Sequence, residues 1–181
     1  MKQTFRTLAK PLLVFLSMLA LSSVAMAKLT KTGSSTAGFI ANATGGLEID
    51  GQVTDLTVAD DGTTVTVTVG LSGIDTGLEL RNKHTKEDLE TDTYPTAKLS
   101  TARSALKLGG GKGDAPGKMT IHGVTRDVTF RYSIRKNGDT LEVNGSVPIN
   151  VKDYGVKPRT YLSIQIKSDV KIYATFQMED R

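Results

Sequence analysis

Apolar and polar residues alternate along most of the chain beyond position 60. Val65, Val67 and Val69 are separated by threonines, and the same two-residue period recurs, with one interruption each, over 124–134, 141–151 and 162–178. Alternation that is rich in β-branched residues predicts strands with one apolar face. The last run is so long that we expect either a very long strand or a bulge near Ser168 and Asp169.

Turn signals separate these runs. Asp61-Gly62 and Asn137-Gly138 each lie between alternating segments, which predicts two tight hairpins. His122-Gly123 predicts another reversal. The stretch Gly109–Gly117 is rich in glycine but lacks the spacing of a phosphate-binding loop, so it predicts a flexible surface loop.

One segment departs from the strand pattern. Thr76 and Glu79 have the spacing of a capping box, and the polar stretch from Leu78 to Leu89 predicts a short helix after it. Tyr94-Pro95 then ends the helical region and returns the chain to a strand over 96–101. The simplest interpretation is a single domain.

Together the elements predict an all-β fold of about eight antiparallel strands, either a barrel or a sandwich. Alternation alone does not decide whether the apolar face of a barrel points inward or outward to lipid. The sequence holds only ten aromatic residues, which is few for the two girdles of an outer-membrane barrel. We therefore expect the apolar face to line the interior.

The amino terminus has the features of a secretory signal. Lys2, Arg6 and Lys10 precede the mostly apolar run 12–21, and Ala25-Met26-Ala27 fits a cleavage site. We expect residues 1–27 to be a signal peptide and residues 28–181 the mature domain, with no membrane span after cleavage. An uncleaved anchor is the less favoured alternative. An exported chain without cysteine suits the bacterial periplasm.

Composition narrows the chemistry. Residues 1–27 carry three of the 23 basic residues and none of the 19 acidic ones, so the remainder has a net charge of +1 and no charge-based reason to bind nucleic acid. With no cysteine and two histidines we expect no metal and no cofactor. His84, Glu87 and Asp88 share one face of the predicted helix, but a solvated face is the favoured interpretation. No catalytic set emerges, so we do not expect an enzyme.

Three segments resemble a known family. They are Ile74-Asp75-Thr76-Gly77 with Leu80, Arg81, His84 and Tyr94-Pro95-Thr96; the run Met119–Val128; and Asp153-Tyr154-Gly155-Val156 with Ser168–Ile172. Their order and spacing resemble the YceI-like periplasmic proteins, the polyisoprenoid-binding lipocalin-like barrels. The resemblance implies an extended eight-stranded antiparallel barrel with a short helical insertion. It also implies a long apolar ligand (isoprenoid-like, quinone-like or fatty) and no established reaction.

The expected ligand contacts follow from the inward parity of the strands and from the predicted helix. The apolar lining should comprise Phe39, Val67, Val69, Leu78, Leu80, Phe130, Tyr132, Val143, Val147, Ile164, Ile166, Ile172 and Phe176. Arg81, His84 and Arg159 are candidate contacts for a polar head group. Two other hypotheses stay open: an enzyme acting on a lipid-like substrate through His84, and a structural or stress protein whose core is filled. The oligomeric state, including a homodimer, is also open.

Overall fold

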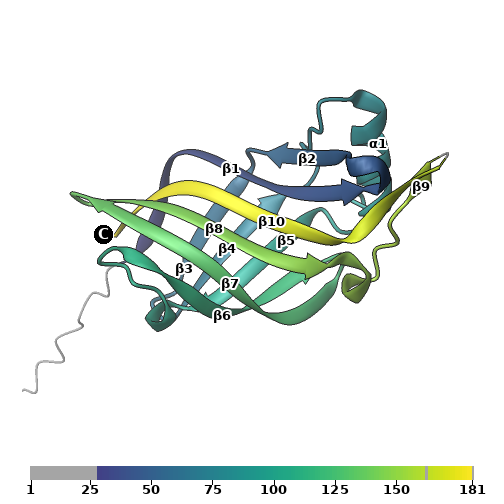
Figure 1. The fold of residues 1–181 in the computed structure, drawn as a ribbon. Helices are drawn as coiled ribbons and strands as arrows, with labels where there is room; N and C mark the ends of the chain where they lie inside the picture. The colour runs from purple at the N-terminus through teal and green to yellow at the C-terminus, as the bar shows by residue number, and fades with distance from the viewer. Residues whose placement is uncertain (1–27, 162, 181) are drawn as a thin grey trace, which may run out of the picture.

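Ten strands and one α-helix make up the computed structural model, which describes residues 28–161 and 163–180 (Figure 1). The predicted signal peptide lies outside the described residues. The strands are β1 (Leu29–Ala43), β2 (Glu48–Val53), β3 (Leu56–Asp60), β4 (Thr64–Gly70), β5 (Thr96–Ala102), β6 (Gly111–Ile121), β7 (Val124–Asn137), β8 (Thr140–Asn150), β9 (Thr160–Tyr161) and β10 (Ile164–Asp180). The helix is α1 (Glu79–Asp88), and short 3-10 turns are η1 (Thr44–Gly46), η2 (Arg103–Ala105) and η3 (Val151–Tyr154).

The antiparallel strands follow the order β2-β1-β10-β8-β7-β6-β5-β4-β3. The two strands at the ends of this order, β2 and β3, are consecutive in the chain, so the backbone at Thr54 and Asp55 carries the sheet round into a nearly closed barrel. Ser35 in β1 donates its hydroxyl to the Thr54 carbonyl at 3.0 Å across this seam. The path holds nine strands where eight were expected, because residues 48–60 pair first with β1 and then with β4.

The last predicted run forms one strand. β10 spans 17 residues and pairs with β1 on one side and β8 on the other. Ala41 faces Val170 while Ala43 faces Ile166, so β10 contains extra residues between these two pairs. This irregularity is the bulge expected near Ser168 and Asp169, and it lets a very long strand follow the curved wall.

The apolar parity points into the barrel. Val65, Phe130, Val143 and Phe176 are buried there from four different strands, while intervening residues face outward. The predicted hairpins are confirmed between β3 and β4, between β6 and β7, and between β7 and β8.

The prediction of a flexible loop over Gly109–Gly117 is wrong. Residues from Gly111 onward belong to β6, which pairs with β7 along its whole length. Gly113 faces Tyr132 and Ala115 faces Phe130 across the two strands. The small residues of β6 therefore make room for the large rings of β7, and their glycine content reflects packing rather than mobility.

The predicted helix is confirmed, but its capping box is wrong. The residue before α1 is Leu78, which provides no side-chain cap. Thr76 lies earlier and gives both its backbone N–H and its hydroxyl to the Asn82 Oδ1 atom, each at 2.6 Å. Asn82 also donates to the Asp75 carboxylate at 3.0 Å, so polar contacts hold the start of this otherwise exposed helix.

An ion-pair cluster ties the barrel together at the end opposite α1. The buried Asp60 carboxylate accepts hydrogen bonds from the backbone N–H of Leu29 and from the Arg103 guanidinium, which also binds Asp180 at 2.7 Å. These contacts join the first, third and last strands. Burial alone would raise the pKa of Asp60, but the N–H groups of Leu29 and Gly62 together with Arg103 outweigh it and lower the pKa below its ordinary 3.8.

A lowered pKa in the folded state means that Asp60 stabilises the fold above pH 3.8 and that this contribution is lost as the pH falls through the folded-state value. We expect Asp60→Asn to lower the free energy of unfolding at pH 7 by about 3 kcal/mol, because Leu29 and Arg103 lose a buried charged partner. Urea unfolding at pH 7 and pH 3 measures this. The variant should lose less stability on acidification than the wild type.

The exposed Asp139→Asn serves as the matched control, since this aspartate lies in the β7–β8 hairpin. Equal loss of stability in the two variants at pH 7 would contradict the role assigned to Asp60.

Candidate functional site

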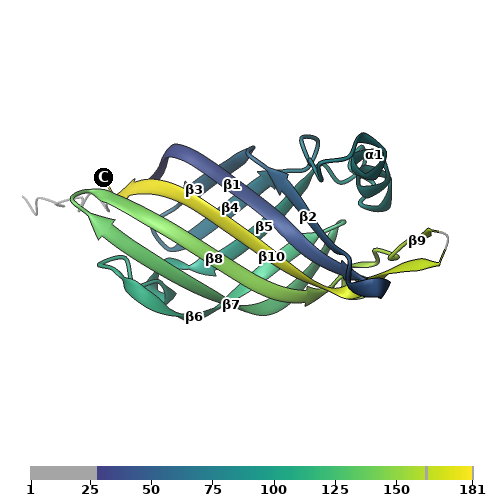
Figure 2. The same ribbon diagram turned by 45° about the horizontal axis from the view of Figure 1, so that its top comes forward.

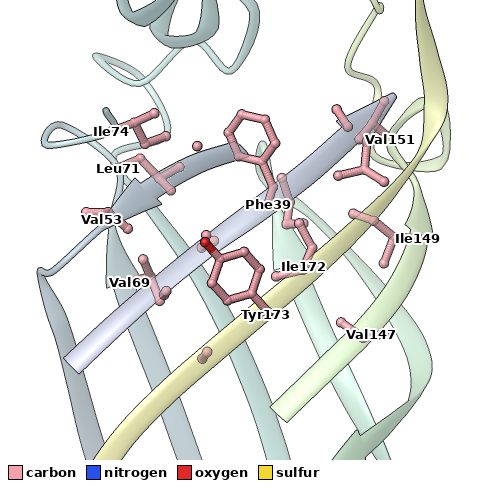
Figure 3. Close-up of a pocket in the computed structure, with 18 of the residues that line it drawn as sticks. Phe39, Val53, Val69, Leu71, Ile74, Val147, Ile149, Val151, Ile172 and Tyr173 are labelled. Carbon is pink, nitrogen blue, oxygen red and sulfur yellow. The ribbon is translucent and has the colours of Figure 1, made fainter. Parts of the chain in front are cut away.

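A cavity of about 510 Å³ lies inside the barrel. Figure 3 shows Phe39 from β1, Val69 from β4 and Ile172 from β10 around one shared space. All thirteen residues of the predicted apolar lining border the cavity, and so do Arg81, His84 and Arg159. The structure thus brings the predicted residues together around a hollow interior; whether they contact a ligand stays a prediction.

The cavity is long and narrow. Both Ile164 and Met178, near the two ends of β10, border it. At about 3.3 Å per residue this stretch spans roughly 46 Å, which a strand tilt of about 40° shortens to about 35 Å along the barrel axis. A volume drawn out over that length is a tunnel, and it suits an extended chain better than a compact molecule.

Two hydroxyl groups deep in the lining, those of Tyr132 and Thr101, are hydrogen-bonded to the protein. The Tyr132 hydroxyl donates to the Ala105 carbonyl and accepts from the Lys107 N–H, both at 3.1 Å. The Thr101 hydroxyl donates to the Pro116 carbonyl at 2.8 Å. Because these groups are satisfied, the deeper part of the cavity offers an apolar ligand no unpaired polar group to cover.

Tyr173, labelled in Figure 3, also borders the cavity, but its hydroxyl is hydrogen-bonded to another strand of the wall. The hydroxyl donates to the Asp50 carboxylate at 2.7 Å, from β10 across to β2. Burial, together with this hydrogen bond, raises the pKa of Tyr173 to about 12. The phenol therefore stays protonated at neutral pH and serves the wall of the barrel.

The charged candidates gather at the α1 end. Arg159 binds Asp88 at 2.7 Å and Glu87 at 3.2 Å, and the hydrogen bond that its guanidinium donates to Asp88 is the main cause that raises the pKa of Arg159. Arg81 donates to the Thr76 carbonyl at 3.2 Å. Arg159 thus joins α1 to the segment before β9, whereas the Arg81 contact is local to the start of the helix. Glu87 and Asp88, two of the three residues on the predicted metal-capable face of the helix, are paired with Arg159.

Within the described part of the chain, no three histidine, aspartate or glutamate side chains are arranged to hold a metal ion. Among the helices described, none is long and apolar enough to cross a membrane.

Sequence reasoning missed the small residues of the lining. Ala37, Ala41, Gly51 and Ala97 all border the cavity, and the small side chains of the three alanines help to leave it open. Gly51 has a specific part, because a Cβ atom there would lie 2.3 Å from the Phe39 ring. The signal was present as small residues at inward positions, but in a sequence such residues look like any weak strand position.

The family model described as the YceI-like domain matches residues 22–178. The chain belongs to the YceI-like family. The predicted resemblance and the barrel fold are both confirmed by this match and by similar solved structures.

Two solved structures illustrate the likeness. A polyisoprenoid-binding domain from Saccharophagus degradans, implicated in plant cell wall breakdown, has a TM-score of 0.69 at 17% identity over 86% of this chain and 99% of that one. BcnA from Burkholderia cenocepacia has a TM-score of 0.67 at 21% identity over 79% of this chain and 95% of that one. At these identities the likeness establishes the fold.

Sequence relatives are known in Pseudomonas. A UPF0312 protein of Pseudomonas aeruginosa strain LESB58 is 30% identical over 101 residues, covering 51% of this chain and 52% of that protein. A UPF0312 protein of Pseudomonas putida strain F1 is 28% identical over 100 residues, with the same coverage. The chain thus spans about half the length of the curated relatives it matches.

The close contact between Gly51 and the Phe39 ring can be tested by substitution. We expect Gly51→Ala to lower the free energy of unfolding by about 1–3 kcal/mol, because the new methyl group forces the Phe39 ring out of its position. Gly145→Ala is the matched control, since it also borders the cavity but its Cβ would meet nothing closer than 3.9 Å. Thermal or urea unfolding measures both. Equal effects would show that Gly51 is not required for the position of Phe39.

Proposed function

We propose that this YceI-like protein binds one long apolar chain inside its barrel, of isoprenoid, quinone-like or fatty type. The observation that carries the proposal is the tunnel itself, which is hollow, apolar and free of unpaired polar groups in its deeper part. A filled core would have placed large side chains where Ala37, Ala41 and Ala97 lie.

The energetics favour such a ligand without a specific head-group site. Burying one CH₂ group contributes about 0.8 kcal/mol, so one five-carbon isoprene unit contributes roughly 4 kcal/mol before the entropy of ordering the chain is counted. A few units suffice for tight binding. The polyisoprenoid named for the S. degradans neighbour is a ligand of this class.

We propose further that the protein acts after export. Residues 1–27 would direct it to the periplasm and be removed, leaving a domain over 28–181. A long apolar chain is poorly soluble in that aqueous compartment, and the tunnel would keep it out of contact with water. Ligand binding inside the barrel is the step that transport, storage and a stress role would have in common.

Native mass spectrometry of the purified protein tests the proposal. We expect a stoichiometric adduct, and solvent extraction should release an isoprenoid, quinone or fatty-chain molecule. The intact mass of the protein also identifies the cleavage site, which we expect after Ala27. A clean ligand-free mass from a host that makes such lipids would contradict the proposal.

We expect Phe130→Arg to abolish the adduct, because a charge inside the tunnel costs several kcal/mol of binding free energy. Thr129→Arg is the matched control, since it places the same charge on the outer face of β7 and should retain the ligand. Ala97→Phe provides a second variant that fills the tunnel with apolar atoms and keeps the fold. Circular dichroism checks folding. A folded Ala97→Phe protein that carries a full-length ligand would place the binding site elsewhere.

We propose no reaction for the site. His84 is the titratable group that sequence reasoning offered for catalysis, and it lies at the charged end of the cavity. We expect His84→Ala to change neither the mass of the extracted ligand nor its affinity by more than about twofold, because the chain is held by apolar contacts. A chemically altered ligand in the variant would instead assign the wild type a catalytic role.

A further inference from the structure

Large apolar side chains are exposed at the α1 end of the barrel. Among the described residues, the exposed large hydrophobic ones are Leu47 (40% exposed), Leu78 (56%), Leu80 (59%) and Ile164 (41%). All four border the cavity. They come from the η1–β2 connection, the start of α1 and the start of β10, which lie at the same end in both ribbon views (Figures 1 and 2).

Hydrogen bonds hold these separate segments side by side. The Thr44 hydroxyl donates to the Ser163 carbonyl at 3.4 Å and accepts from the Gln165 N–H at 3.0 Å, which places η1 against the start of β10. The ion pairs of Arg159 with Glu87 and Asp88 join α1 to the segment before β9. Leu47, Leu78, Leu80 and Ile164 therefore form one rim around the opening, which we call the mouth rim.

Basic residues accompany the mouth rim. The stretch 157–167 holds Lys157, Arg159 and Lys167 and no acidic residue. Lys157 and Lys167 are exposed, border the cavity and form no ion pair with another described residue. With Lys152 they also border an adjoining surface hollow beside η3.

Part of the acidic charge near this end is engaged with other groups, whereas Glu48 and Glu79, the chain neighbours of Leu47, Leu78 and Leu80, are exposed and form no ion pair with another described residue. Glu87 and Asp88 bind Arg159, and the Asp169 carboxylate accepts a hydrogen bond from Asn150 at 3.0 Å. Of the described charged residues that border the cavity, five are lysine or arginine and one is acidic. The mature chain carries a net charge of only +1, and within the mouth rim the positive charge lies on the side of the stretch 157–167.

We propose that the mouth rim docks on an anionic lipid surface. Exposed leucine side chains next to free lysines are the combination by which proteins lie on a membrane: the apolar groups enter the acyl boundary and the cations meet anionic head groups. Contiguous exposed apolar residues around an opening also mark an interaction site in general.

A second copy of the chain fits the rim less well. A symmetric rim-to-rim contact would bring Lys157 and Lys167 of both copies to one interface, where like charges repel. An anionic bilayer meets both the apolar and the basic part of the rim at once.

Docking would let an apolar chain pass between the bilayer and the tunnel without crossing water. That consequence rests on the proposed function, whereas the contact with the bilayer does not. Vesicle binding and ligand content can therefore be measured independently, and either can fail alone.

Flotation of the purified protein with vesicles tests the proposal, using phosphatidylcholine alone and a 3:1 mixture of phosphatidylcholine and phosphatidylglycerol. We expect binding to the mixed vesicles that weakens as salt rises, and little binding to neutral ones. Intact mass of the bound fraction confirms that residues 1–27 are absent. Failure of the wild type to float with anionic vesicles would overturn the proposal.

Two double variants separate the contributions. Leu78→Ser with Leu80→Ser should weaken binding about tenfold or more, and Lys157→Glu with Lys167→Glu about thirtyfold or more. Lys112→Glu with Lys136→Glu, which changes exposed lysines of β6 and β7, is the charge-matched control and should bind as the wild type does. Unfolding curves confirm that all variants fold.

Equal binding by the rim variants and the control would overturn the assignment of the rim. Sedimentation equilibrium decides between a bilayer and a second copy. The proposal would be overturned if the protein did not bind anionic vesicles and formed a dimer that the substitutions of Leu78 and Leu80 abolish. That result would assign the rim to self-association.

Discussion

The structure depends on one constraint: a sheet that closes on itself encloses an interior, and this interior must either be filled by side chains or remain as a cavity. Here the backbone turn at Thr54 and Asp55 carries the last strand of the sheet back beside the first, and every inward residue then faces the others across one interior. Small residues such as Ala37, Ala41 and Ala97 leave that interior open. The tunnel is thus a direct consequence of closure combined with small inward side chains.

The two ends of the barrel differ in chemistry. At one end, the cluster around Asp60 and Arg103 joins strands from the beginning, middle and end of the chain. At the other end, α1 buries no residue and is attached through polar contacts of Asn82 and Arg159. Contacts of this kind are exchanged with water more easily than packed apolar ones. One end therefore stabilises the fold, while the other surrounds the opening.

The sequence predicted β4, β5, β7, β8, the long irregular β10, the hairpins and the large apolar residues that border the cavity, because inward parity in an amphipathic strand is a local property. It did not predict that Gly111–Gly117 would pair with β7, since only the neighbouring Tyr132 and Phe130 rings reveal why small residues are needed there. The Thr76–Asn82 contact was missed for a similar reason: a competing side-chain acceptor replaced the expected cap. Whether the barrel is hollow depends on the summed volume of the inward side chains from all strands. No single stretch of the sequence contains that sum.

We propose that a long apolar ligand acquired from outside the protein occupies the interior of the barrel. A crystal structure of the protein as isolated, without added lipid, is the decisive measurement. We expect continuous elongated electron density along the barrel axis that contacts Phe39, Val69 and Ile172 and belongs to no residue of the protein. An interior filled by the protein's own side chains, with no space between β4 and β10, would contradict it.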